Sequence, residues 1–169
     1  TPAQFTVTAP VNGQNATVTG LEAAWQQTIG DTGFGFQLNG TLVGSNRQLN
    51  LQDLTNKFAL TGLSNSANAV AFYDKHGIEA RVAFNWRDHF LQYLAPPPLN
   101  GAGQAVTQVR AYSQVDASLT YHINKAFSVF AEGANIFDNK AEKYAYFTNQ
   151  FLYAEDSGRR LKVGARINF

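Results

Sequence analysis

Apolar and polar residues alternate one by one along most of the chain, which is the pattern of β-strands whose two faces meet different surroundings. In residues 78–87 the even positions, from Ile78 to Trp86, are all apolar, whereas the odd positions carry every charge. The same alternation occurs in 110–123 and 160–169. The pattern therefore predicts an all-β, antiparallel chain with one apolar and one polar face.

We expect about eight strands, at residues 5–9, 19–29, 34–42, 65–74, 78–87, 110–123, 127–138 and 160–169. Most are about 10 to 14 residues long, against a mean of about 5 or 6 in soluble proteins. Two are less regular, since 65–74 is apolar on both faces and 127–138 places Phe130 and Ile136 in the phase of Glu132. Residues 5–9 suggest a strand that has lost its start.

Short and long connections alternate along the chain. The short ones, Gly30–Gly33, Asp74–Gly77 and Asn124–Lys125, hold residues that tolerate a left-handed backbone. The long ones, of about twenty residues each, are 45–64, 90–109 and 139–157. All three long loops then lie at one end of the sheet, an asymmetry typical of transmembrane β-barrels.

Composition fits this picture. Charged residues make up 15% of the 169 residues, below the roughly 25% of an average soluble domain. The net charge of +1 argues against nucleic acid as a partner. The chain has no cysteine and no apolar run near the roughly 18 residues of a transmembrane helix. Its start has no signal-peptide pattern, so an exported chain would be missing its beginning.

A soluble antiparallel sandwich would also alternate, so it stays open as an alternative. Strand length, the loop asymmetry and the mixed charges of the polar face favour a closed barrel around a water-filled lumen. In a bilayer an open sheet edge would leave backbone groups unpaired in hydrocarbon. Aromatic residues near the short turns, among them Trp25, Tyr121 and Phe169, would then form part of an interfacial girdle.

The end of the chain, Gly158–Phe169, resembles the last strand of outer-membrane barrels. In that strand a polar residue, a glycine and alternating apolar residues ending on Phe form a signal for the outer-membrane assembly machinery. Here these places are occupied by Lys162, Gly164, Ile167 and Phe169.

Further segments resemble TonB-dependent receptors, and they occur in the family's order. They are Val18–Gln27 with its Gly-x-Glu pattern, Gly62–Asn68, Ala80–Arg87, Gln114–Ser118 and Glu132–Asp138. The resemblance covers essentially the whole chain and is closest to the proteobacterial branch linked to oligosaccharide uptake. It implies that residues 1–169 are the C-terminal portion, about the last eight strands, of a 22-stranded plugged barrel whose plug domain and earlier strands are absent.

The resemblance also implies a function, the TonB-dependent active uptake of a scarce nutrient, an oligosaccharide first, across the bacterial outer membrane. Its partners would be outer-membrane lipid, the chain's own N-terminal plug, the TonB complex and the assembly machinery, with no cofactor. Alternatives are a ferric-siderophore receptor of the same family and a small autonomous eight-stranded barrel, structural or hydrolytic. We expect no enzyme, because His76, His89 and His122 have no metal-site or triad spacing.

Aromatic and amide residues in one long loop are the best ligand candidates, because sugar rings stack on aromatic side chains and amides bind hydroxyls. The candidates are Tyr93, Tyr144, Tyr146, Phe147, Asn149, Gln150, Phe151 and Tyr153. Some of these aromatics could instead extend a strand above the membrane and pack against neighbouring loops.

Charged residues in the polar phase are expected to face the lumen and contact the plug or pair between strands. They are Glu22, Glu79, Arg81, Arg87, Arg110, Asp116, Glu132, Arg160, Lys162 and Arg166.

Overall fold

The structure, a computed structural model, describes residues 14–52, 58–95 and 105–168. The expected strand at 5–9 and the last residue of the assembly signal, Phe169, lie outside the described residues. No helix in the described part of the chain is long and apolar enough to cross a membrane.

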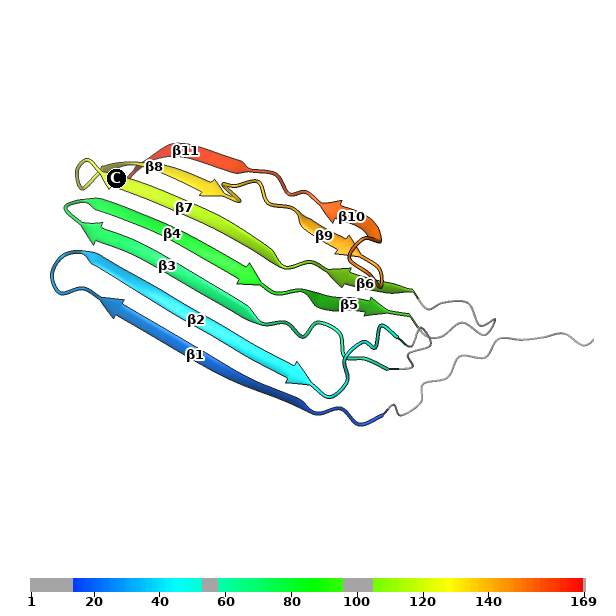
Figure 1. Cartoon of the computed structure of the whole chain (residues 1–169). Coiled ribbons are helices and arrows are strands. Elements are labelled where there is room, and N and C mark those ends of the chain that lie inside the picture. Colours follow the sequence, from blue (N-terminus) through cyan, green and yellow to red (C-terminus); the bar gives the residue numbers. More distant parts are fainter. Residues whose placement is uncertain (1–13, 53–57, 96–104, 169) are drawn as a thin grey trace, which may run out of the picture.

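The described residues form two antiparallel sheets (Figure 1). A seven-stranded sheet has the order β1 (Val18–Thr28), β2 (Phe34–Ser45), β3 (Ser66–Lys75), β4 (Ile78–Arg87), β7 (Tyr112–His122), β8 (Phe127–Ala134) and β11 (Arg160–Ile167). A four-stranded sheet has the order β10 (Phe151–Glu155), β9 (Ala141–Tyr144), β6 (Val106–Val109) and β5 (Phe90–Leu94). The small sheet continues from the ends of β4, β7, β8 and β11 (Figure 1).

The predicted all-β, antiparallel fold is confirmed, and each predicted strand within the described residues is present. The strands of the large sheet have 8 to 12 residues. One strand ends early: β8 stops at Ala134 instead of residue 138, because Asn135 and Asp138 take positive φ angles of 52° and 57° and turn the chain.

Two of the three long connections are not irregular loops, which corrects the sequence prediction. Residues 90–109 contain β5 and β6, and residues 139–157 contain β9 and β10. These strands are only four or five residues long. Irregular pairing between Leu91 and Tyr93 further hides the period-two pattern.

Local chemistry explains the short turns. His76 and Gly77, with φ angles of 57° and 75°, connect the paired residues Lys75 and Ile78, as a type I′ hairpin requires. In the turn between β7 and β8, Oδ1 of Asn124 accepts hydrogen bonds from the backbone N–H groups of Ala126 and Phe127, both at 2.9 Å.

The register gathers the alternating residues into two continuous faces. One cross-strand row of the apolar face runs through Trp25, Leu38, Ala69, Phe84 and Val115. A row of the opposite face runs through Asn39, Asn68, Asn85 and Gln114. Within that row Nδ2 of Asn68 donates to Oδ1 of Asn39 at 2.6 Å. Every strand of the large sheet therefore contributes to one apolar and one polar surface.

The apolar face is not covered. Leu21 is 67% exposed, Leu119 48% and Val163 81%. The hydrophobic core of the described residues lies instead beside the small sheet, where Ala59 packs with Leu91 and Val106. The large sheet is consequently apolar on a surface that no layer of the described residues buries.

Successive hairpins are staggered by a constant amount. The last backbone pair before each turn is Ile29 with Phe34, then Lys75 with Ile78, then Ile123 with Phe127. The register places each of these pairs two residues further along the strands than the pair before it, which is one residue per strand. With a rise of about 3.4 Å per residue and about 4.8 Å between strands, turns at a common level require a tilt of about 35°.

The large sheet is open, with β1 and β11 as its edge strands. The closed barrel expected from the sequence is therefore not formed by the described residues.

Candidate ligand-binding site

The regular pairing of the large sheet breaks at its loop end, and the break exposes polar side chains. Strand β4 ends at Arg87 and β5 begins at Phe90, which leaves Asp88 and His89 between them. Nη2 of Arg87 donates to the carbonyl of Gly62 at 2.8 Å, and its guanidinium lies 3.8 Å from the centroid of the Phe90 ring. Arg87 thus fastens the 45–64 connection to the break.

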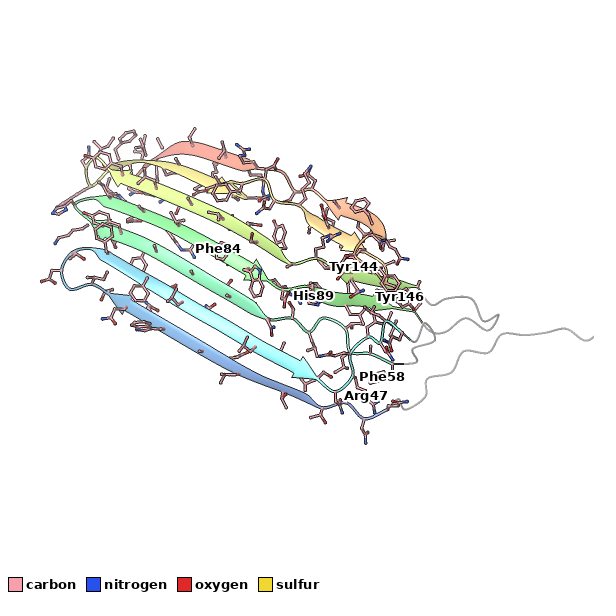
Figure 2. All side chains as sticks on the ribbon, viewed as in Figure 1. Arg47, Phe58, Phe84, His89, Tyr144 and Tyr146 are labelled. Carbon is pink, nitrogen blue, oxygen red and sulfur yellow. The ribbon has the colours of Figure 1, made fainter. Side chains whose placement is uncertain are left out.

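An open cleft of about 670 Å³ lies at this break. It is lined by Leu51, His89, Gln108, Arg110, Ala111, Tyr144, Tyr146, Phe147 and Thr148. Figure 2 shows His89 near the junction of the two sheets, with Tyr144 and Tyr146 further along the small sheet. The volume falls within the roughly 300–1,000 Å³ typical of small-molecule sites.

Tyr144 and Arg110 lie together in the cleft, and neither adds an unbalanced charge to it. Tyr144 is 5% exposed, and burial raises the pKa of its phenol, so the hydroxyl stays neutral at physiological pH. The guanidinium of Arg110 lies 5.4 Å from its ring centroid. Nε of Arg110 is buried and lies 2.9 Å from Oε2 of Glu142, without the alignment of a hydrogen bond. The cation is thereby neutralised from outside the cleft.

The turn that carries the cleft aromatics is internally braced. Oε1 of Gln150 accepts hydrogen bonds from the backbone N–H groups of Tyr146 at 3.0 Å and Phe147 at 3.1 Å. Nε2 of Gln108 donates to the carbonyls of Ala145 at 2.8 Å and Tyr146 at 3.1 Å. These bonds fix the backbone of the turn, so its aromatic side chains are presented in a defined position.

Of the predicted ligand residues, Tyr144, Tyr146 and Phe147 line this cleft. Tyr93, Asn149, Gln150, Phe151 and Tyr153 are not among its lining residues. Tyr144 belongs to β9, and Phe151 and Tyr153 belong to β10, so these three do extend strands. Tyr153 stacks on the Lys143 ammonium, whose Nζ lies 4.8 Å from the ring centroid.

Sequence reasoning missed Leu51, His89, Gln108, Ala111 and Thr148 as lining residues. A signal was present for Gln108, which shares the even-numbered polar phase of Arg110. His89 follows a strand end, where a polar residue is ordinary.

Nine of the ten charged residues assigned to the polar phase lie on the polar face of the large sheet, and Arg110 lies at the break. Two cross-strand contacts occur among them and their neighbours. Nε2 of His122 lies 2.9 Å from Oε1 of Glu79, and Nζ of Lys162 lies 3.4 Å from Oε2 of Glu132. Lys162 and Glu132 therefore pair opposite charges between neighbouring strands, and His122 contacts the Glu79 carboxylate across the next pair of strands.

Two glycines make room for aromatic rings on the polar face. Gly164 lies opposite Phe130, and a Cβ built on Gly164 would lie 2.6 Å from that ring. Gly35 lies opposite Phe72 in the same way. A ring that covers a cross-strand glycine restores the packing that the glycine lacks. This explains why Phe130 shares the phase of Glu132, and it gives Gly164 of the expected assembly signal a packing role.

Other chemistry is sparse in the described residues, which contain no group of three or more His, Asp or Glu side chains able to hold a metal ion. Nδ1 of His76 lies 3.2 Å from the hydroxyl of Tyr73 at the opposite end of the strands. No protein-family model, curated protein or solved structure matches the chain.

Proposed function

We propose that this chain forms the C-terminal part of the wall of an outer-membrane β-barrel of the TonB-dependent receptor type, which takes up an oligosaccharide. The observation that carries the proposal is the exposed apolar face that runs across all seven strands of the large sheet, backed by a polar face. A bilayer on one side and a water-filled lumen on the other match these two faces.

The alternative of a soluble sandwich needs a second sheet that buries the apolar face. Here the four-stranded sheet continues the large one from its end (Figure 1). Soluble monomers rarely expose a contiguous apolar patch larger than a few hundred Å². The uncovered face therefore favours lipid as its partner.

Dimensions support the same setting. Strands β3 and β4 have ten residues each. At a rise of about 3.4 Å and a tilt of about 35°, ten residues span about 28 Å along the barrel axis. The apolar band of outer-membrane barrels is about 25 Å tall, and a hydrocarbon core is about 30 Å thick.

The open edges support closure by further strands. In hydrocarbon each unpaired backbone group costs several kcal/mol, so a spanning sheet has no free edge. Strands β1 and β11 would then pair with further strands of the complete barrel. The ordered motifs that resemble TonB-dependent receptors suggest that this barrel is the 22-stranded, plugged type.

In this function the wall residues act by position. The cleft at the loop end would capture the nutrient outside the cell. The plug domain expected in a complete receptor would report occupancy to TonB, and the proton-motive force of the inner membrane would drive passage. Tyr144, Tyr146 and Phe147 supply aromatic surface suited to sugar rings.

Cysteine scanning tests the membrane setting, because the described chain has no cysteine of its own. Single substitutions Ala80→Cys, Val82→Cys and Phe84→Cys sample the apolar face, and Glu79→Cys and Arg81→Cys sample the polar face. In intact outer membranes of cells making the full-length protein, we expect the thiols of the first set to stay unlabelled by an aqueous maleimide, because the reactive thiolate does not form readily in hydrocarbon. A charged maleimide, added after the outer membrane is permeabilised, should label only the second. Equal labelling of both sets by the charged reagent would contradict the proposal.

Uptake tests the transport step. Cells that make the protein should accumulate a labelled oligosaccharide, and deletion of TonB or collapse of the proton gradient should abolish accumulation while leaving binding at the cell surface. Accumulation that persists without TonB would refute energy-coupled uptake.

A further inference from the structure

A second cavity adjoins the aromatic cleft. It has a volume of about 400 Å³ and lies between the end of β2, the 45–64 connection and β5. Its lining includes Ser45, Arg47, Asn65 and Asp88. Three residues, Leu51, His89 and Gln108, line both cavities. The two hollows are therefore neighbouring lobes with a shared boundary.

His89 is held at this boundary in a defined orientation. Its Nδ1 lies 2.9 Å from Oδ1 of Asp88, and its backbone N–H donates to the same oxygen at 2.8 Å. The His89 hydrogen bond lowers the pKa of Asp88, so this carboxylate is ionised and can only accept. When the ring is neutral, this contact places the hydrogen on Nδ1 and leaves Nε2 as an acceptor. The His89 side chain is 64% exposed, so a ligand can reach it.

The charges of the two lobes cancel. Arg47 and Arg110 are the cations of the lining, and Asp88 is its anion. Glu142 neutralises Arg110 at 2.9 Å, and Nε of Arg47 donates to the carbonyl of Asn15 at 2.9 Å. A charged ligand that leaves water needs an unspent opposite charge in its site. The balanced lining favours a ligand that is polar but carries no net charge.

We propose that the two lobes form one groove for a neutral linear oligosaccharide of at least two sugar rings, with Nε2 of His89 accepting a hydroxyl hydrogen bond at the boundary. One ring lies against the aromatic lobe of Tyr144, Tyr146 and Phe147, and the next enters the polar lobe. Asp88 is a positioning residue that acts through His89. The inference rests on the proposed uptake function and narrows its ligand.

Calorimetric titration of the full-length protein in detergent tests the groove. The probes are glucose, maltose and maltohexaose, the matching chito- and xylo-oligosaccharides, and ferric citrate as an anionic chelate. We expect affinity to rise at least about tenfold from one ring to several rings in one of the sugar series. We expect no heat from ferric citrate.

Two histidine variants separate a ligand contact from a general effect. His89→Ala should weaken oligosaccharide binding about three- to tenfold, as loss of one neutral hydrogen bond does. The matched control is His76→Asn at the opposite end of the strands, where asparagine tolerates the positive φ of 57°. This control should leave the affinity unchanged.

The outcomes are distinguishable. Undiminished binding by His89→Ala, or equal affinity for one ring and several, overturns the groove while TonB-dependent uptake stands. Heat from ferric citrate with none from any sugar overturns the neutral ligand but keeps a receptor. Failure of the uptake function itself would appear separately, in the uptake assay, as cells that accumulate none of the labelled oligosaccharide.

The role of Asp88 has its own test. Asp88→Ala should weaken binding in the parent protein but have no further effect in the His89→Ala background. Additive losses would show that Asp88 acts without His89 and would overturn its positioning role.

Discussion

Replacement of Val82 by arginine should distinguish a lipid-facing surface from a wet one. Val82 is the fifth residue of the ten-residue strand β4 and points to the apolar face, where it is 50% exposed. Its cross-strand neighbours, Ala71 and Ala117, are too small to cover a long side chain. An arginine here would meet whatever medium lies against the sheet.

The expected loss of stability follows from the depth of Val82 within the apolar band. Val82 lies four residues from Ile78 at the turn end of the strand, which is about 11 Å along the axis at a 35° tilt. In a band about 28 Å thick this is about 3 Å from the midplane. Arginine at the midplane of an outer-membrane barrel costs about 2–4 kcal/mol. An exposed surface substitution in water changes stability by about 0.5 kcal/mol or less.

The assay is reversible denaturant unfolding of the full-length protein in lipid vesicles, followed by tryptophan fluorescence. The matched control is Asn85→Arg in the same strand, which points to the polar face between Asn68 and Gln114. We expect Val82→Arg to lower the free energy of unfolding by about 2–4 kcal/mol and Asn85→Arg to change it by less than about 0.5 kcal/mol. Equal changes for the two variants would refute the assignment of the faces.

Three further outcomes follow from particular contacts. Gly164→Ala places a Cβ 2.6 Å from the Phe130 ring and should lower the free energy of unfolding by about 1–3 kcal/mol. The double variant Gly164→Ala, Phe130→Ala should lose less stability than the sum of the losses in the two single variants. Gly77→Ala, at a φ of 75° and 3.0 Å from the His122 carbonyl, should cost about 1–2 kcal/mol in the same assay; an unchanged stability would contradict the type I′ turn. The hydrogen bond from His89 lowers the pKa of the Asp88 carboxyl below its ordinary 3.8. The Asp88–His89 contact should therefore persist above pH 3.8 and be lost as the pH falls through the lowered pKa. Carbon NMR titration of Asp88 should find a midpoint below 3.8 in the parent protein and a midpoint closer to 3.8 in His89→Ala.

The large sheet could be predicted from the sequence because most of its strands span several periods of alternation. Residues 78–87 depart from alternation only at Ala83, and β4 has the same bounds. The turn at His76 and Gly77 could be placed because few residues accept positive φ at two successive positions. The stagger of the hairpins could not be predicted, since register depends on which residues face each other and not on the pattern within one strand.

The candidate site was only partly predictable, because its residues come from segments that are distant in sequence. The aromatic composition of 143–153 pointed to Tyr144, Tyr146 and Phe147, which do line the cleft. Nothing in the sequence indicates that His89 meets Gln108 and Leu51 at one boundary. Gln150 was predicted to bind a sugar hydroxyl, but its side-chain oxygen accepts hydrogen bonds from the backbone of its own turn.

In the proposed membrane setting, the position of the cleft follows from the length of the strands relative to a bilayer. Strand β4, the break at Asp88 and His89, and β5 together run from Ile78 to Leu94. At about 3.4 Å per residue and a 35° tilt, those residues extend about 47 Å, well beyond the roughly 30 Å of a hydrocarbon core. The small sheet must then stand above the membrane if β4 spans it. In the proposed membrane setting the break would fall at the level where the wall leaves hydrocarbon, because only there can unpaired backbone and charged groups such as Asp88 be hydrated. A break in the ladder opens the cleft, so in this setting the limit that ends the membrane-spanning sheet would also position the proposed ligand groove at the outer surface.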